Sequence, residues 1–214
     1  MTNRLLKCGV LAGPVYIVVG LLQAIFREGF DIRRHALSLM SNGALGWIQV
    51  ASFIVTGLLV IAGAIGMRQR LHPGRADTWA PILLGIYGLG LIGAGIFAAD
   101  PMDGFPPGTP AGPPAAISWH GPLHFVAGGI GFVGLVGATL VFARRFAALR
   151  EWGWATFSLA TGVLFLAGFG NIASGARAPW INLAFTAVVV LSWAWLSAVS
   201  ARLMTPRASM VSHG

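Results

Sequence analysis

The sequence predicts an all-α membrane protein with six transmembrane helices. Only 9% of its 214 residues are charged and 56% are apolar, whereas a soluble domain carries roughly a quarter charged residues. The apolar residues form six runs of the length, about 20 residues, that spans a bilayer. Tryptophan marks the start of five of these runs. The predicted spans are about 8–26, 47–67, 79–98, 120–142, 153–172 and 181–201.

The first span follows Arg4 and Lys7, as the apolar part of a signal peptide would. It is longer than such a segment, and no small-residue cleavage site follows it. We therefore predict an uncleaved span. Its Cys8 is the single cysteine of the sequence, which excludes a disulfide framework or a thiolate metal site within one chain.

Spans two to six are predicted from their tryptophans as well as from their hydropathy. Indole rings prefer the headgroup level of a membrane. Small residues four apart, which let membrane helices approach closely, occur in three spans. The tryptophans are Trp47, Trp79, Trp119, Trp152 with Trp154, and Trp180, and the small pairs are Gly9/Gly13, Gly90/Ala94 and Gly134/Ala138.

The two halves of the chain suggest a 3+3 inverted repeat. The stretch that begins Gly13-Pro14 is similar to the one that begins Gly121-Pro122, half a chain later. Three spans per half would place the halves in opposite orientations, as in many transporters. Chance similarity in an apolar alphabet is the alternative, and the scarcity of polar groups in mid-membrane argues against an ion-coupled carrier.

The basic residues predict the orientation. Ten lie in the N-terminus, the second and fourth loops and the tail, and four lie in the other three loops. Basic residues stay on the cytoplasmic side, so both termini are predicted to be cytoplasmic. This topology and attraction to anionic lipid at the cytoplasmic face account for the net charge of +8 without nucleic-acid binding.

The expected setting is a bacterial inner membrane. Thirteen arginines against one lysine suggest a GC-rich, bacterial genome. Residues 1–205 are expected to form a single membrane domain, and residues 206–214 a flexible cytoplasmic tail.

The first outer loop predicts a short amphipathic helix at the membrane surface. Asp31, His35, Ser38 and Asn42 recur at the spacing of one helix face. Asp31 is a candidate N-cap, and Gly43 is a candidate helix end. The alternative is a solvated helix face with no further role.

The third outer loop is rich in proline and glycine and has no basic residue. Such a segment cannot form a regular helix, so we predict an extended cover over the outer mouth. Its acids, Asp100 and Asp103, come just after the third span. Asp100-Pro101 also fits a simple helix stop.

The stretch "SWHGPLHF" opens the fourth span and contains two histidines one helical turn apart, His120 and His124. Ser118 is a candidate N-cap. The spacing of the histidines allows both rings to share a metal ion. The alternatives are a non-metal pocket, an interfacial His120, and a His124 packed between helices. The third ligand that zinc needs is available from His35, Asp31 or Asp100.

The end of the fifth span contributes two more polar residues. Asn171 and Gly175 fit an ordinary helix end. Arg177 is the one basic residue predicted outside beyond the first loop. It has two expected partners, an acid of the third loop or an anionic headgroup.

These residues resemble a bacterial membrane family called domain of unknown function 998. The likeness covers the six-span plan, "FDIRRHALSLMSNGALGW", "FAADPMDGFPPG" and Gly121 to His124. The resemblance implies a six-helix integral membrane protein without an established activity. A weaker analogy links His35, Ser38, Asp100, His120 and His124 to zinc-dependent membrane hydrolases such as alkaline ceramidases, which have seven spans and a different order of motifs.

Three functions follow as hypotheses. The first is an integral membrane protein whose outer polar pocket binds a lipid headgroup or a small ligand. The second is a zinc-dependent membrane hydrolase acting on lipid, and the third is a small transporter. The candidate pocket residues are Asp31, His35, Ser38, Asp100, His124, Asn171 and Arg177, and the candidate zinc ligands are His35, His120, His124 and Asp100.

Overall fold

A computed structural model describes residues 1–74, 76–175 and 178–205 of the chain. Long helices joined by loops make up these residues, with one isolated β-bridge between Met102 and Phe105. All six long helices are apolar enough to cross a membrane. They are α1 (Thr2–Phe26), α2 (Gly46–Leu71), α3 (Trp79–Ile96), α4 (His120–Ala148), α5 (Trp152–Ala173) and α6 (Pro179–Met204).

The six predicted spans are confirmed, and several helices are longer than their apolar runs. Helix α1 begins at Thr2, α2 continues to Leu71, and α4 continues to Ala148. Hydropathy detects only the part of a helix that crosses the hydrocarbon. A helix that continues into the headgroup region carries polar residues there, so its ends are not visible as an apolar run.

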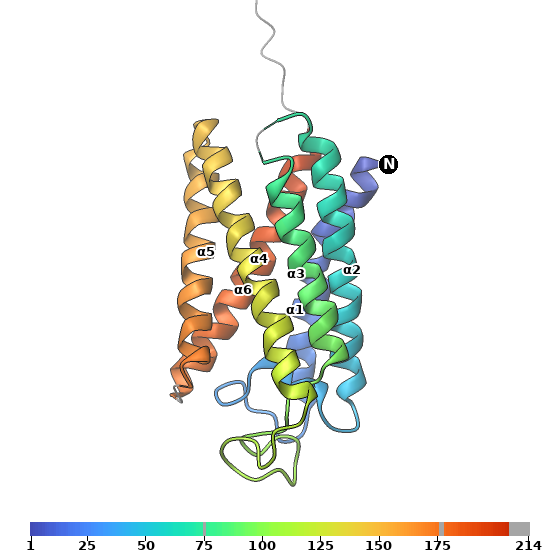
Figure 1. Cartoon of the computed structure of the whole chain (residues 1–214), viewed down its shortest axis with the longest axis vertical. Helices are drawn as coiled ribbons and strands as arrows, with labels where there is room; N and C mark the ends of the chain where they lie inside the picture. Colours follow the sequence, from blue (N-terminus) through green and yellow to red (C-terminus); the bar gives the residue numbers. More distant parts are fainter. Residues whose placement is uncertain (75, 176–177, 206–214) are drawn as a thin grey trace, which may run out of the picture.

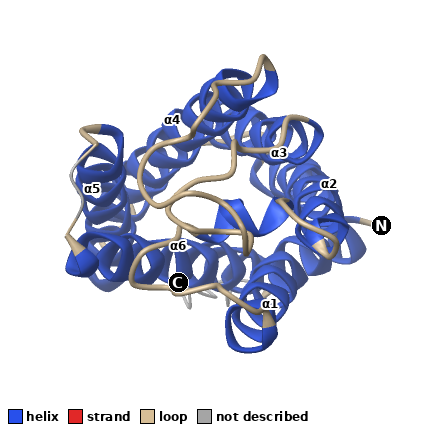
Figure 2. Ribbon diagram, turned by 90° about the horizontal axis from the view of Figure 1, so that it is seen from below, coloured by secondary structure: helices blue, strands red, loops and turns tan. Residues whose placement is uncertain are grey.

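The helices form a closed ring in chain order. Each helix packs against the next one, and α6 returns to pack against α1, as Figure 2 shows in a view along the bundle. The start of α1 and the end of α6 lie at the same end of the bundle (Figure 1). There, Arg70 donates to Asn3 Oδ1 at 2.7 Å and to the Met204 carbonyl at 3.5 Å. We call this the terminal end and the opposite one the loop end.

The predicted small residues bring helix backbones together. A Cβ added to Gly90 would lie 2.6 Å from Cα of Gly131 on α4. A Cβ added to Gly13 would lie 2.7 Å from the Trp193 carbonyl oxygen on α6. Such contacts supply the close packing that holds membrane helices together where lipid gives no hydrophobic driving force.

The predicted inverted repeat is not established by this arrangement and stays a prediction. Pro14 lies in the middle of α1, whereas Pro122 lies in the first turn of α4. The two similar stretches therefore sit at different depths of their helices.

The short helix predicted in the first loop is present, but it is shorter than the stretch from Asp31 to Gly43 and is of the 3-10 type. The loop contains a five-residue 3-10 helix, Leu37–Ser41, whose apolar side chains are buried. The Asp31 carboxylate does not cap it. It accepts bonds from the Arg33 backbone and guanidinium, and such local bonds compete with helix formation. Gly43 follows with a φ of +75°, as its predicted role at a helix end requires.

Arg27 attaches the first loop to the end of α1. Its guanidinium donates to the Met40 carbonyl at 2.9 Å and to the Asn42 carbonyl at 2.6 Å. The same group lies 5.3 Å from the centroid of the Phe105 ring of the third loop. Burial lowers the pKa of this guanidinium, which still carries its charge because arginine does not deprotonate in proteins.

The third loop runs across the loop end of the ring, as Figure 2 shows. Phe105 is fully buried within it. Asn42 of the first loop donates to the Ala99 carbonyl at 2.9 Å, so the two loops form one cover. The irregular, covering course that the proline-rich sequence predicts is present here.

Candidate functional site

A cavity of about 710 Å³ lies inside the ring of helices. All six helices and both long loops of the loop end contribute to its lining. We call it the central cavity. Its lining is apolar and aromatic in the interior, and its charged residues belong to the loops of the loop end.

Aromatic rings form the deep end of the central cavity. Tyr16 stacks on Trp193 with ring centroids 4.7 Å apart, and Tyr87 lies 5.6 Å from the same tryptophan. Phe53 adjoins Tyr16 at 6.0 Å. Tyr16, Trp193 and Tyr87 lie near the middle of α1, α6 and α3, so the cavity reaches from the loop end into the middle of the bundle.

A second aromatic group lines the cavity where α4, α5 and α6 meet. Phe132 of α4 lies 4.9 Å from both Phe165 and Phe169 of α5, measured between ring centroids. Phe185 of α6 lies 6.2 Å from Phe132. Edge-on ring contacts of this kind are favourable and present apolar ring faces and edges to the cavity.

The cavity has space between α4 and α5 toward the loop end. Gly128 and Gly129 line it. A Cβ added to Gly128 would meet nothing within 4 Å, and one added to Gly129 would meet only the Phe169 ring at 4.0 Å. Nearer the terminal end the two helices touch, because a Cβ on Gly162 would collide with Thr139.

The mouth of the central cavity is polar. Among the residues that the structure describes, two arginines and two aspartates line it, so the formal charges of these four side chains cancel. Asn182 of α6 donates to the Arg34 carbonyl at 2.7 Å and so attaches the first loop to α6. The polar mouth residues are Arg33, Arg34, Ser38, Asp100, Asp103 and Asn182.

Asp100 lies over the start of α4. Its two carboxylate oxygens accept from the Ser118 backbone N–H at 3.2 and 3.3 Å. The Ser118 hydroxyl accepts from the Gly121 N–H at 3.0 Å, although the N-cap position of α4 is held by Trp119 and not by the predicted Ser118. The carboxylate occupies the space of a Gly121 side chain. A negative charge at a helix N-terminus is stabilised there, so Asp100 has a structural role as well as a place in the mouth.

His124 lines the central cavity and is bonded to α3 on one side. Its Nδ1 lies 2.8 Å from the Phe97 carbonyl oxygen and 3.0 Å from that of Ala94. Carbonyl oxygens only accept hydrogen bonds, so Nδ1 carries the proton. In the neutral ring, Nε2 is then a lone-pair acceptor. Within the described part of the chain, no residue donates to it.

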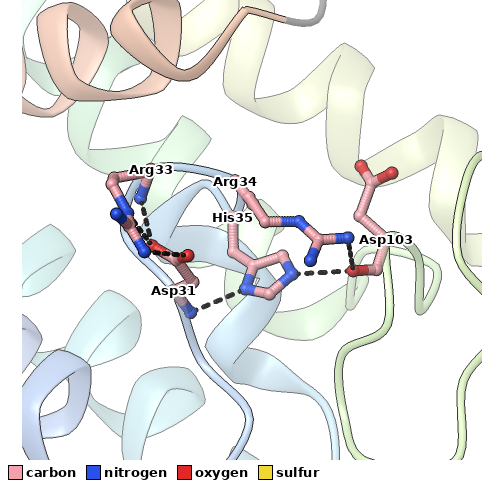
Figure 3. A network of polar contacts seen from close by, with 5 residues as sticks. All are labelled: Asp31, Arg33, Arg34, His35 and Asp103. Atoms are coloured by element: carbon pink, nitrogen blue, oxygen red, sulfur yellow. Dashed lines mark hydrogen bonds and ion pairs between the residues drawn. The ribbon is translucent and has the colours of Figure 1, made fainter.

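His35 lies outside the central cavity, in a network that joins the two long loops (Figure 3). Its Nδ1 accepts from the Asp31 N–H at 2.9 Å, and its Nε2 donates to the Asp103 carbonyl at 3.0 Å. Both ring nitrogens are therefore used. The Arg33 guanidinium hydrogen-bonds the Asp31 carboxylate and holds its pKa below the usual value. This exposed pair positions the loop.

The predicted site residues lie in different parts of the structure. Ser38, Asp100 and His124 line the central cavity, and Asp31 and His35 form the loop network. Asn171 is exposed and donates to the Ala167 carbonyl of its own helix. Arg177 lies outside the described residues.

The candidate zinc ligands are not gathered in one place. His120 donates from Nδ1 to the Ala98 carbonyl at 2.8 Å, and His35 is bonded through both nitrogens. Across residues 1–74, 76–175 and 178–205, no group of three His, Cys, Asp or Glu side chains lies close enough to hold a metal ion.

Sequence reasoning missed the aromatic lining of the cavity and its α6 side. Phe165 and Phe169 are one turn apart on α5, and Asn182 and Thr186 are one turn apart on α6. The second pair was the available signal, because a polar pair on one face of a membrane helix faces the protein interior or a cavity.

Comparison with known proteins identifies one family. A family model described as "Protein of unknown function (DUF998)" matches residues 10–202, most of the chain. No curated protein and no solved structure matches the chain.

Proposed function

We propose a function for this chain, which belongs to the DUF998 family of proteins of unknown function, from the chemistry of its central cavity. The cavity binds a small amphiphile, with the apolar chain against the aromatic lining and the polar group at the mouth. The observation that carries this proposal is the separation of the lining residues that the structure describes: aromatic rings lie in the interior, and the charged side chains lie at the loop end.

Size and lining both support an amphiphilic ligand. A cavity of about 710 Å³ falls within the range of roughly 300–1,000 Å³ that is usual for small-molecule sites. Burial of apolar surface contributes about 25 cal/mol per Å², so an alkyl chain is the part of the ligand that this lining favours. The space between α4 and α5 gives such a chain a route from the surrounding lipid.

The loop end faces the outside of the cell in this proposal, and the ligand comes from the outer leaflet of a bacterial inner membrane. The basic residues support this orientation because they favour the cytoplasmic side and gather at the terminal end. The basic residues of the terminal end that the structure describes are Arg4, Lys7, Arg68, Arg70, Arg144, Arg145, Arg150 and Arg202.

Anionic lipid is the proposed partner at the terminal end. A smaller cavity of about 150 Å³ is lined there by Arg70, Arg145 and Arg202 together with one acid, Glu151. Three arginines against one acid give this lining, as far as the structure describes it, an excess of positive charge, and Arg202 contacts the Glu151 carboxylate at 3.3 Å. Basic pockets between membrane helices on the cytoplasmic side suit phosphate headgroups.

Binding of tritiated hexadecanol and of hexadecyl methyl ether to protein in lipid nanodiscs tests the main proposal. The informative variant is Gly128→Trp, because this glycine lines the cavity and has free space beside it. We expect saturable binding of at least one probe to the wild type and at least tenfold weaker binding to the variant.

Gly85→Trp is the matched control. Its Cβ also meets nothing within 4 Å, but Gly85 does not line the cavity, so binding should stay at the wild-type level. The proposal fails if neither probe binds the wild type saturably, or if both tryptophan variants bind like the wild type.

The two other functions stay predictions. Zinc analysis of the purified protein tests the lipid hydrolase, with a His120→Ala/His124→Ala double variant as comparison. Cysteines at the midplane that react from both sides of the membrane would support the transporter.

A further inference from the structure

We infer that His124 accepts a hydrogen bond from a hydroxyl group of the ligand, so that the amphiphile in the central cavity is a neutral alcohol. This inference rests on the proposed function and names the chemical class of its ligand. It starts from one ring nitrogen of a side chain that is 6% exposed.

The first step fixes the tautomer. Both atoms that Nδ1 contacts are carbonyl oxygens, those of Ala94 and Phe97. They belong to the last turn of α3 and the residue after it, where carbonyl groups lack partners within the helix. The proton therefore stays on Nδ1, and the ring cannot turn over without leaving both carbonyl oxygens without the hydrogen bond from His124.

The second step concerns the charge of the ring. An imidazolium buried to this degree is costly unless a carboxylate pairs with it, and no ion pair joins His124 to an acid among the described residues. The mouth carboxylate of Asp100 is bonded to the Ser118 N–H. The ring is therefore neutral, and Nε2 is an acceptor.

The third step places this acceptor in the cavity. The Nδ1 edge of the ring faces α3, and the ring as a whole lines the cavity, so the Nε2 edge is the one that contacts the cavity. Neither of two donor side chains in the mouth donates to it: the Asn182 amide bonds the Arg34 carbonyl, and the Arg33 guanidinium bonds Asp31. A ligand that leaves Nε2 unbonded leaves a buried acceptor unsatisfied, which costs free energy.

The fourth step selects the polar group of the ligand. A carboxylate or a phosphate would bring further lone pairs to Nε2, and it would bury a charge beside this neutral ring. An ammonium would also add an unpaired buried charge. A hydroxyl group supplies the proton without a charge. An ether of the same chain supplies none and is therefore the matched probe.

The experiment compares tritiated hexadecanol with hexadecyl methyl ether and palmitate in nanodiscs. We expect the wild type to bind the alcohol about tenfold more tightly than the ether, the ratio for one lost bond that leaves an acceptor unpaired. Palmitate should bind no better than the ether.

His124→Asn is the deciding variant. The asparagine Nδ2 is bonded to Cγ, as the histidine Nδ1 is, so it still donates to the α3 carbonyls, but the residue has no atom in the place of Nε2. We expect wild-type thermal stability and equal affinity for alcohol and ether. His124→Ala removes both functions and should lower the stability as well.

The outcomes separate the two proposals. If neither alcohol nor ether binds the wild type, the proposed function and this inference both fail. If both bind equally well and Gly128→Trp weakens both, only the inference fails. It also fails if His124→Asn keeps the preference for the alcohol.

A measurement on the wild type covers the case in which His124→Asn does not fold. In protein with ¹⁵N-labelled histidine, hexadecanol should shift the signal of one unprotonated ring nitrogen, and the methyl ether should leave it in place. Identical responses to the two probes would overturn the inference.

Discussion

At the scale of single residues, the C-terminal end of α3 and the residues after it explain the positions of several polar side chains. His124 bonds the Ala94 and Phe97 carbonyls, His120 bonds that of Ala98, and Asn42 bonds that of Ala99. The last carbonyl groups of α3 lack partners within the helix, as do those of the irregular residues that follow it, and near a membrane side chains replace the water that would bond them. The sequence marks these residues as unusual because they are polar, and their first role is to satisfy the backbone.

Arg27 gives a prediction at this scale. Arg27→Ala removes the donors to the Met40 and Asn42 carbonyls, and bonds from a charged donor contribute about 1.5–3 kcal/mol. We expect a clear fall in the thermal unfolding temperature in detergent. Arg33→Ala is the control, because its pair with Asp31 is exposed and such pairs add little. Equal effects of the two variants would contradict the role of Arg27.

Gly121 gives a second prediction. In Gly121→Ala the new methyl group would displace the Asp100 carboxylate from the start of α4. We expect a loss of about 1–3 kcal/mol in the free energy of unfolding, the cost of a buried group without its partner. Gly128→Ala lies on the same helix beside free space and should show no loss. A stable Gly121→Ala protein would argue that the carboxylate moves freely.

At the scale of elements, α3 is held from two sides by glycine contacts. Gly88 faces the Gly57 carbonyl of α2 at 2.7 Å, and Gly90 faces Cα of Gly131 of α4 at 2.6 Å, both measured from an added Cβ. The shortest of the six helices, with 18 residues, thus lies close to both of its neighbours. Its position determines where His124 finds its carbonyl partners.

This packing predicts the effect of a larger side chain on α3. Gly90→Leu meets backbone atoms of α4, which cannot turn aside as a side chain can, and overpacking typically costs about 1–3 kcal/mol or more. We expect Gly90→Leu to lower the unfolding temperature strongly, or to prevent accumulation of folded protein. Gly85→Leu points into open space and should behave like the wild type, as measured by size-exclusion chromatography and thermal unfolding.

At the scale of the whole molecule, the ring predicts how the chain sits in the membrane. The start of α1 and the end of α6 both lie at the terminal end, where the arginines gather. Alkaline phosphatase fused after Met204 should be inactive in bacterial cells, and the same enzyme inserted after Gly108 of the third loop should be active. The reverse pattern would place the loop end, and the mouth of the cavity, in the cytoplasm.

Hydropathy and tryptophan position were sufficient for the six spans, because lipid imposes the length and composition of a crossing segment. The same patterns contain no signal for the packing of α6 on α1. The spacing of Asp31, His35, Ser38 and Asn42 fits a helix, but three of these side chains bond local or neighbouring backbone groups instead. Spacing alone cannot show that competition.

The candidate site was only partly predictable for a similar reason. His124 and Asp100 stand out as polar residues at a span boundary. The rings of Phe132, Phe165 and Trp193 do not stand out, because an aromatic residue that lines a cavity looks in sequence like one that fills a core. Only the arrangement of the helices separates the two.

The contact of Arg70 with both Asn3 and Met204 shows that the start of α1 lies beside the end of α6. A short linker from Met204 to Thr2, with new ends opened in the turn between α4 and α5, would keep every helix neighbour of the ring. In such a circular permutant, α1 and α6 would be joined by the chain. Helices α4 and α5 would lose their covalent connection, beside the proposed entry route of the ligand.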